Sequence, residues 1–326
     1  VYLMKKRKFL SEFGVNIRSL STMFMPADQL HSDGTMKELD EEISKKCHIY
    51  LITKRPSTYF IKDSLTYING NLEVTVGYKI RGEEFTYVHK GKFELLDGAT
   101  SIEISPYPHR DLITFDSKGN PVRKLPAGIV SVKKIDELEV LYVGQAFGDG
   151  SRTARERLKN HSTLQKILAD TAYTNPDSEI SVVMVQFEQY HLISTVGGQS
   201  SELISGKEND ERFYAIVDNP LSEKKQIGLV EASLIRYFQP HYNDKFKIKF
   251  PSPKVKLLKK CFELDFSGLI VEINTQDIGF KLYSERVKSK DHHMANIDIV
   301  SKKSRASFFY VSMGGTDVAL WDGLIS

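Results

Sequence analysis

Apolar and polar residues alternate with a period of two over much of the first third of the chain, which is typical of half-buried strands. Strand-like runs cover residues 48–53, 72–80 and 85–96, and turn residues such as Asn69-Gly70-Asn71 separate them. A polar run near 36–47 has the pattern of a helix. These patterns predict a helical start followed by a meander of antiparallel strands.

Three further apolar runs indicate a second group of strands in the middle of the chain. They are Gly128-Ile129-Val130, Leu141-Tyr142-Val143-Gly144 and the buried run from 179 to 188. The segment from 190 to 227 is longer than a minimal core requires, and we expect an insertion there. Within it, residues 194–212 mix Ser, Gly, Glu and Lys and are predicted to form an exposed loop.

Helices are predicted between the second and third of these strands. A capping box indicates a helix from about Ala154, and a second one starts just past His161. Arg157 and His161 are four residues apart and would share one helix face. Tyr142 closes an apolar run beside a Gly-rich loop. A phenol, a guanidinium and an imidazole can therefore meet at one place.

A carboxylate lies within the apolar stripe of a later helix. Glu231 shares one arc of about 140° of the helical wheel with apolar residues, and a surface helix usually buries such a face. These residues are Val230, Leu234, Ile235 and Phe238. Because glutamate is rarely buried alone, Glu231 needs a cation or a metal ion beside it. Pro240 ends the helix, and Asn243 follows shortly after it.

In this order, these residues resemble the motifs of the GIY-YIG nuclease family. The family pattern is GIY, then YIG or YVG, an Arg on a helix, a Glu on a further helix, and an Asn. The matching residues here are Gly128-Ile129-Val130, Tyr142-Val143-Gly144, Arg157, His161, Glu231 and Asn243. The resemblance covers residues 124–245 and is closest to the restriction-enzyme branch, which has the Arg-x-x-x-His pair.

The resemblance implies an α+β fold whose central domain is a small three-stranded antiparallel sheet flanked by helices. It places that domain at residues 124–250, with the insertion near 190–227 inside it. Residues 1–123 would form an N-terminal region with a helical start and then strands. Residues 251–326 would form a β-rich C-terminal region.

The resemblance also implies a metal-dependent endonuclease that hydrolyses phosphodiester bonds of DNA. Glu231 would hold one Mg²⁺ or Mn²⁺ ion, which polarises the phosphate. Tyr142 would take a proton from water with help from His161, and Arg157 would stabilise charge on the phosphoryl oxygens. Asn243 completes the catalytic set. By analogy, restriction or phage defence is the expected setting.

Two positions depart from the family pattern. Val130 replaces the tyrosine of the first motif, and Gln145 replaces a lysine that contacts phosphate in many relatives. Both departures support an alternative function, a catalytically inactive nucleic-acid-binding protein on the same scaffold. Mg²⁺-dependent nicking of plasmid DNA distinguishes the two hypotheses.

A lysine-rich segment follows the predicted site. Lys245, Lys247 and Lys249 alternate with apolar residues up to Phe250, which predicts one strand with a cationic face. This face would either contact the phosphate backbone of nucleic acid or protect a solvated strand edge. The sequence does not distinguish DNA from RNA, or a monomer from a homo-oligomer.

Composition adds limits of its own. A chain of 326 residues predicts two or three domains, and its net charge of +3 by itself says nothing about nucleic acid. Cys47 and Cys261 are too few for a disulfide framework or a zinc site, and reduced core cysteines fit a cytoplasmic protein. No uncharged apolar run reaches the roughly 18 residues that would cross a membrane.

Overall fold

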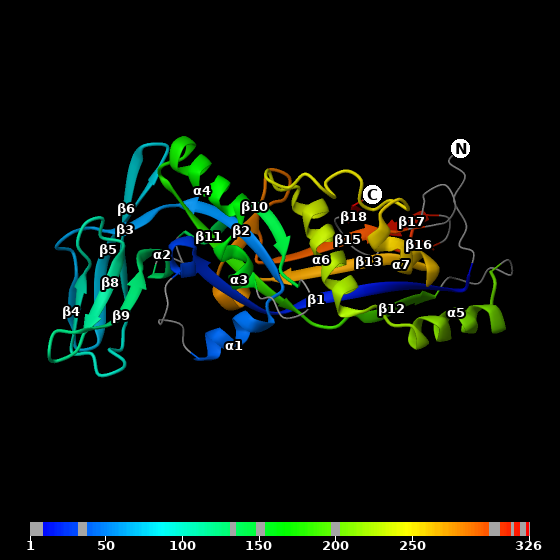
Figure 1. The fold of residues 1–326 in the computed structure, drawn as a ribbon, viewed down its shortest axis with the longest axis horizontal. Coiled ribbons are helices and arrows are strands. Elements are labelled where there is room, and N and C mark those ends of the chain that lie inside the picture. Colours follow the sequence, from blue (N-terminus) through cyan, green and yellow to red (C-terminus); the bar gives the residue numbers. More distant parts are fainter. Residues whose placement is uncertain are drawn as a thin grey trace.

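One mixed sheet of nine strands organises the protein in a computed structural model. The model describes residues 9–31, 38–130, 135–147, 154–196, 203–299, 307–313, 316–319 and 324–325. The strands of the sheet are β1 (Ser11–Pro26), β2 (Ile49–Pro56), β10 (Glu137–Gln145), β11 (Ser178–Phe187), β12 (His191–Val196), β13 (Phe266–Asn274), β14 (Lys281–Tyr283), β15 (His292–Asp298) and β18 (Leu324–Ile325). Their order is β14-β10-β2-β11-β1-β13-β15-β18, and β12 also pairs with β1 (Figure 1).

The sheet curls around the long strand β1. The C-terminal part of β1, residues 19–26, pairs antiparallel with β11. The N-terminal part, residues 11–18, pairs antiparallel with β12 and parallel with β13. After β13, the short helix η3 (Gln276–Ile278) returns to β1, where the Asp277 carboxylate accepts hydrogen bonds from the backbone N–H and the hydroxyl of Thr22. The chain then enters β14 at the opposite edge of the sheet, beside β10. The sheet is therefore barrel-like and nearly closed.

The predicted fold, a small three-stranded antiparallel unit, is wrong. β10, β2 and β11 are antiparallel neighbours, but they belong to the nine-stranded sheet. Gly128-Ile129-Val130, which we expected to be a strand, lies in the four-residue helix α2 (Ala127–Val130). The position beside β10 is taken by β2, where the side chains from Ile49 to Ile52 are all buried, as the centre of a sheet requires. The predicted segments 1–123, 124–250 and 251–326 all contribute strands to this one sheet.

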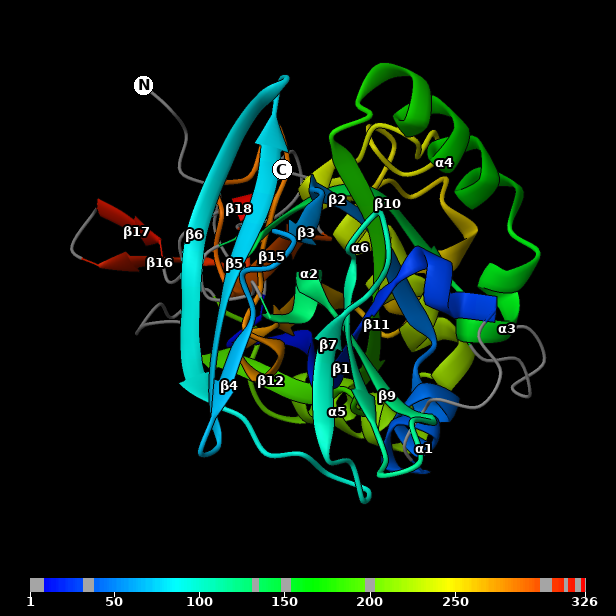
Figure 2. The same cartoon turned by 90° about the vertical axis from the view of Figure 1, so that its left-hand side faces the viewer.

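The segment between β2 and β10 forms a β-rich module at one end of the large sheet (Figures 1 and 2). One of its sheets holds β3 (Thr58–Phe60), β4 (Thr66–Ile68), β5 (Asn71–Ile80) and β6 (Glu83–Lys92), and the other holds β7 (Ser101–Ile104), β8 (Asp111–Phe115) and β9 (Pro121–Pro126). The two sheets enclose a separate core that includes Phe60, Val74 and Leu112. The antiparallel strands predicted at 72–80 and 85–96 are confirmed as β5 and β6. The run at 48–53, predicted to belong to the same meander, is instead β2 of the large sheet. Asn69 and Gly70 form a tight turn of the module, with positive φ angles of 50° and 76°.

Helices cover both faces of the sheet where β2 and β10 meet. α6 (Glu223–Phe238) packs on the face that bears Ile49 and Leu51. On the face that bears Tyr50 and Ile52 lie α3 (Ala154–Lys159) and α4 (Ser162–Thr174). Because side chains alternate along a strand, consecutive residues of β2 reach two different cores.

The remaining elements are η1 (Ala27–His31), α1 (Glu38–Lys46), α5 (Lys207–Asp218), η2 (Lys256–Leu258), α7 (Lys259–Glu263), β16 (Tyr310–Met313) and β17 (Thr316–Ala319).

Several local predictions can be compared with these elements. The predicted helix near 36–47 is α1, the helices predicted from about Ala154 and past His161 are α3 and α4, and the buried strand predicted at 179–188 is β11. The loop predicted at 194–212 is wrong at both ends of this range. Residues 194–196 belong to β12, and residues 207–212 belong to α5. Cys47 and Cys261 are free and buried, as expected.

The strand predicted from Lys245 to Phe250 is also wrong, because this segment consists of bends and turns. Phe246 has a φ angle of 67°, which an extended strand does not allow. The Arg236 guanidinium donates a hydrogen bond of 2.6 Å to the carbonyl of Lys247 and anchors the turn to α6. Lys245, Lys247 and Lys249 therefore do not form one strand face.

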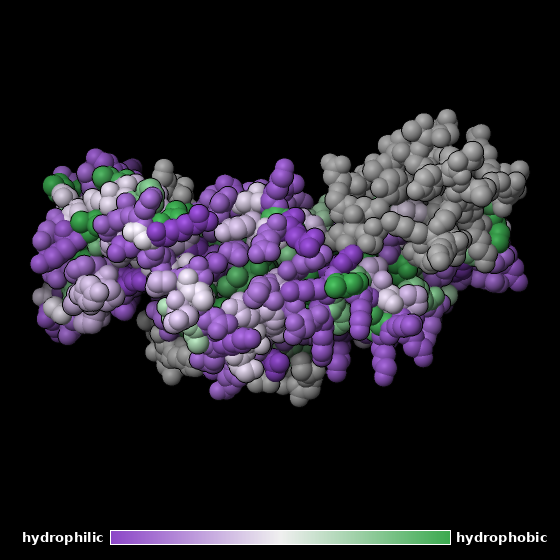
Figure 3. Space-filling view, turned by 90° about the horizontal axis from the view of Figure 1, so that it is seen from above, coloured by the Kyte–Doolittle hydropathy of each residue, from purple (hydrophilic) through white to green (hydrophobic). Residues whose placement is uncertain are grey.

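The described helices include none that is long and apolar enough to cross a membrane. On the face shown in Figure 3, hydrophilic side chains cover most of the coloured surface, and apolar side chains form small separate groups. This distribution is common for proteins whose apolar residues are enclosed in internal cores.

A cluster of charged side chains joins the β-rich module to the large sheet, and its centre is the ion pair between Arg55 in β2 and Glu179 in β11. The Arg55 side chain is fully buried, its Nε lies 2.7 Å from Glu179 Oε1, and its guanidinium lies 5.0 Å from the ring centres of Phe24 and Phe280. Arg110, from the module, contacts the other oxygen of Glu179 at 3.3 Å. A Cβ atom on Gly128 would lie only 2.0 Å from Nη2 of Arg55.

We predict that Gly128→Ala lowers the free energy of unfolding by about 1–3 kcal/mol, because the enclosed Arg55 has little room to move. Denaturant unfolding measures this change. Gly91→Ala is the matched control in the same module, since its Cβ would meet only His89, at 3.7 Å. Equal stability of the two variants would contradict the tight packing around Arg55.

Candidate active site

On the edge of β10 away from β2, the segment that carries Tyr142 is fixed by a side chain rather than by a further strand. β14 pairs only with residues 137–139 of β10. Farther along, Asn243 Oδ1 accepts a hydrogen bond from the backbone N–H of Val143, and Asn243 Nδ2 donates to the Val143 carbonyl, both at 2.9 Å. The side chain thereby imitates a neighbouring strand and attaches the segment after α6 to β10.

This geometry changes the role expected for Asn243. The residue is buried and lies at the predicted site, but both polar atoms of its side chain already bind the peptide of Val143. Asn243 therefore positions β10 relative to α6 rather than contacting a substrate.

Tyr50, in β2, forms a cluster with His161 and Tyr142. Its hydroxyl oxygen is 3.1 Å from His161 Nε2, and its ring centre is 6.2 Å from that of Tyr142. The rings of Tyr142 and His161 are closer still, with centres 5.3 Å apart. A side-chain hydrogen bond with Tyr50 lowers the pKa of Tyr142.

The ring of His161 has a defined tautomer. His161 is the N-cap of α4, and its Nδ1 accepts the backbone N–H of Leu164 at 3.2 Å. Burial and the nearby charge of Arg157 lower the pKa of His161, which favours the neutral ring. Because Nδ1 is an acceptor, the ring proton is on Nε2, which donates to Tyr50.

The prediction that Arg157 and His161 share one helix face is wrong. α3 ends at Lys159, and His161 begins the next helix. The N-cap hydrogen bond of His161 favours this break, since an N-cap residue has an extended backbone. The turn between the helices nevertheless brings both side chains to the tyrosine pair.

Arg157 is the cation of this cluster. It is exposed, it hydrogen-bonds to the Tyr50 hydroxyl, and its charge also acts on Tyr142 and Glu231. A guanidinium that is both exposed and next to two phenols can contact an anionic group that approaches from solvent.

Glu231 lies on α6 and faces the end of β10. Burial raises the pKa of Glu231 to about 7, although hydrogen bonds from Gln145 and the charges of Arg157 and Lys245 oppose this shift. The side-chain amide of Gln145 donates to Glu231 Oε2 at 2.9 Å. The carboxylate is thus poorly compensated, as the sequence predicted.

The charge of Glu231 also affects Tyr142. Burial is the main cause of the raised pKa of Tyr142, and the negative charge of Glu231 adds to it. Arg157 and Tyr50 act in the opposite direction but do not cancel the increase. A further cation next to Glu231 would remove the repulsion and would favour the phenolate form of Tyr142.

The three predicted nucleic-acid-binding lysines have different surroundings. Lys245 is exposed, and its charge lowers the pKa of Glu231, so it lies near the site. Lys247 Nζ donates to the carbonyl of His241 at 3.1 Å. Lys249 is exposed, and no interaction connects it with Glu231.

Sequence reasoning did not identify Tyr50 as a site residue. The tripeptide His48-Ile49-Tyr50 has the form of the family's first motif, with His in place of Gly, and it resembles that motif more closely than Gly128-Ile129-Val130 does. The long module between β2 and β10 separates it from Tyr142 in the sequence. A search for the tyrosine without a limit on this spacing would have found it.

The residues at Glu231 fit a hard divalent cation. In the part of the chain that the structure describes, no three His, Cys, Asp or Glu side chains are placed to share a metal ion. Mg²⁺, however, commonly binds one or two carboxylates and takes its other ligands from water and substrate phosphates. The half-buried Glu231, a carboxylate with a raised pKa, would provide one such ligand.

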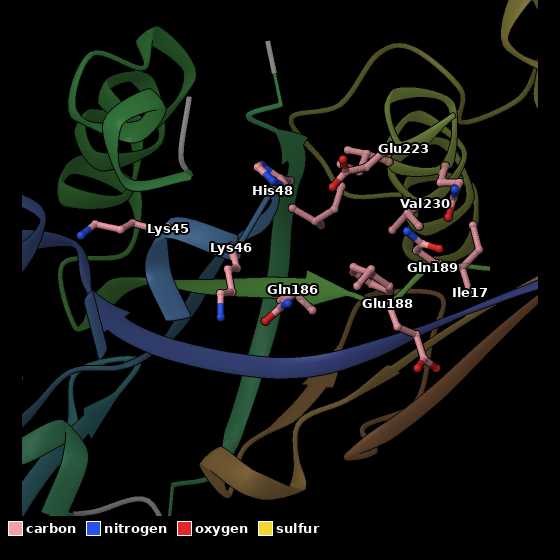
Figure 4. Close-up of a pocket in the computed structure, with 14 residues that line it drawn as sticks. Ile17, Lys45, Lys46, His48, Gln186, Glu188, Gln189, Glu223 and Val230 are labelled. Atoms are coloured by element: carbon pink, nitrogen blue, oxygen red, sulfur yellow. The ribbon is translucent and has the colours of Figure 1, made fainter. Parts of the chain in front are cut away.

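A pocket of about 210 Å³ lies near the site but does not contain it (Figure 4). It opens between the end of α1, the start of β2 and the first half of α6, where Lys46, His48 and Val230 are among its lining residues. Ile49, which also lines it, points away from the core that holds Tyr50. None of the predicted site residues lines the pocket.

Comparison with known proteins gives no relative, because no protein-family model, no curated protein and no solved structure matches this chain.

We predict that Glu231→Gln makes stability less dependent on pH. A carboxyl whose pKa rises from an ordinary 4.5 to about 7 binds its proton more tightly in the folded state. Without divalent cations, the wild-type free energy of unfolding should therefore fall by up to about 3 kcal/mol as the pH rises from about 4.5 to about 7.

Denaturant unfolding at pH 4.5 and pH 8 tests this prediction. Glu231→Gln should be more stable than the wild type at pH 8, and this difference should disappear near pH 4.5. The exposed Glu211→Gln is the control and should behave like the wild type. A parallel pH dependence of wild type and Glu231→Gln would show that Glu231 is not desolvated.

Proposed function

We propose that this protein is a metal-dependent nuclease that hydrolyses phosphodiester bonds of DNA. One observation carries the proposal: five separate elements bring Tyr142, Tyr50, His161 and Arg157 together around the poorly compensated carboxylate of Glu231. These groups are a base, a hydrogen-bond relay, a cation and a metal ligand, which are the components that phosphodiester hydrolysis requires.

The groups around the Tyr142 hydroxyl support Tyr142 as the base. Its hydrogen bond with Tyr50 and the charge of Arg157 both lower its pKa, against the effects of burial and of Glu231. His161 and Arg157 in turn contact the Tyr50 oxygen. The phenolate can then accept a proton from the attacking water.

The remaining charges have separate tasks in this proposal. Arg157 is exposed and would stabilise the negative charge on the phosphoryl oxygens. Mg²⁺ or Mn²⁺ bound to Glu231 would supply a Lewis acid for the phosphate and would offset the repulsion between Glu231 and Tyr142. Lys245 would contact a phosphate of the DNA backbone beside the scissile one.

The biological role and the oligomeric state are proposed by analogy with the restriction-enzyme branch that the sequence resembles. We place the enzyme in restriction or phage defence, acting as a monomer or as a homo-oligomer. The two buried, free cysteines fit the reducing cytoplasm.

A second candidate function is supported by specific observations. Gln145 replaces the phosphate-binding lysine of many relatives, and the pKa of Tyr142 is raised rather than lowered. A catalytically inactive nucleic-acid-binding protein would have both features. Incubation of purified protein with supercoiled plasmid, with Mg²⁺ and with EDTA, separates the two functions, because only the nuclease converts the plasmid in a Mg²⁺-dependent way.

We predict that Tyr142→Phe lowers the rate of plasmid cleavage by about 100-fold or more, since the loss of a general base typically costs 10²–10⁴ in rate. The melting temperature should change little, because only a hydroxyl is removed. Tyr173→Phe, at an exposed position on α4, is the matched control and should cleave normally. Normal cleavage by Tyr142→Phe would exclude Tyr142 as the base.

We predict that Lys245→Gln weakens DNA binding for all sequences alike, whereas Lys249→Gln has little effect. The plot of log affinity against log salt concentration should become less steep by about 0.9 when one phosphate contact is lost. Binding titrations in Ca²⁺ at several salt concentrations measure this slope. An equal change in the two variants would mean that Lys245 has no special position beside Glu231.

A further inference from the structure

Gln145 contacts the Glu231 carboxylate through its side chain, whose Nε2 donates a hydrogen bond to Oε2 at 2.9 Å. Gln145 is the last residue of β10, and Glu231 is in the middle of α6. The contact thus ties the helix that carries the carboxylate to the strand that carries Tyr142.

This contact orients the carboxylate to which a metal ion would bind. The hydrogen bond from Gln145 occupies one position on Oε2 and restrains the orientation of the Glu231 side chain. Among the groups that act on Glu231, the other partners are Arg157 and Lys245, and both act through their charges. Gln145 is therefore the neutral group that determines where the carboxylate points.

We propose that Gln145 is a positioning residue for a divalent cation at Glu231. Its hydrogen bond to Oε2 fixes the direction in which the carboxylate faces the cation. This inference rests on the proposed function, because it assumes the metal site of the nuclease. Groups that orient a metal ligand in this way typically contribute 10–100-fold to metal affinity.

The proposal also depends on the absence of charge on the side-chain amide of Gln145. A lysine at position 145 would place an ammonium group next to Oε2, where it would pair with the carboxylate and repel a divalent cation. An amide donates a similar hydrogen bond without a positive charge. The replacement of lysine by glutamine in this chain therefore keeps the charge of Glu231 available to the metal ion.

The experiment measures Mn²⁺ binding by calorimetric titration at pH 8, in the absence of nucleic acid. The full chain is compared with Gln145→Met, Gln145→Lys, Glu231→Gln and Gln189→Met. Met keeps the length of the side chain but cannot donate a hydrogen bond. Gln189 is an exposed glutamine that is not in contact with Glu231, and its substitution is the matched control. Melting temperatures establish that each variant is folded.

We expect Gln145→Met to lower the affinity for Mn²⁺ by about 10–100-fold. Gln145→Lys should lower it at least as far, Glu231→Gln should abolish binding at this site, and Gln189→Met should bind like the wild type. A purely structural role for Gln145 would instead lower the melting temperature and leave the affinity unchanged. Unchanged affinity in Gln145→Met, or in Gln145→Lys if the Met variant does not fold, would overturn the proposal.

Plasmid cleavage, measured in parallel, separates this inference from the proposed function. If the wild type binds Mn²⁺ through Glu231 but does not cleave DNA, the nuclease proposal fails, and the affinities still decide the role of Gln145. If wild type and Glu231→Gln bind Mn²⁺ equally, the cation does not bind at Glu231, and the inference is overturned.

Discussion

The desolvated carboxylate of Glu231 is the constraint around which the site is built. Moving an ionised carboxylate out of water is costly, and the protein offsets the cost only in part, through Gln145 and the charges of Arg157 and Lys245. The raised pKa of Glu231, about 7, reflects the part of this desolvation cost that these groups do not offset. A site that keeps a half-buried charge under-compensated is well suited to bind a cation, which is why our proposal of a metal site and of nuclease chemistry rests on this one residue.

The nine-stranded sheet makes this arrangement possible by bringing distant segments of the chain together. β2 and β10 are neighbours although the β-rich module lies between them in the sequence. The module closes its own core, and its Arg110 contacts Glu179 of the large sheet, so the module adds length to the connection without disturbing the sheet. The entropic cost of a longer connection grows slowly with its length, and an insertion at this point is well tolerated.

Much of the local structure could be predicted from the sequence because it depends on short-range patterns. Period-two alternation gave the strands of the module, capping signals gave the start of α3, and the apolar stripe of α6 showed that Glu231 would be buried. The same local signals failed for Gly128-Ile129-Val130 and for Lys245 to Phe250. There, packing against Arg55 and the hydrogen bond from Arg236 outweighed the intrinsic preference for a strand.

The sequence by itself therefore indicated most of the residues to which we propose to assign the chemistry, namely Tyr142, Arg157, His161 and Glu231, because their types and their positions on predicted elements are local properties. Only the tertiary structure decided that Tyr50 joins them, that Asn243 fixes β10, and that Gln145 holds the carboxylate. Each of these contacts joins residues far apart in the chain. Strand order and the orientation of side chains between elements set such contacts, and no local pattern encodes them.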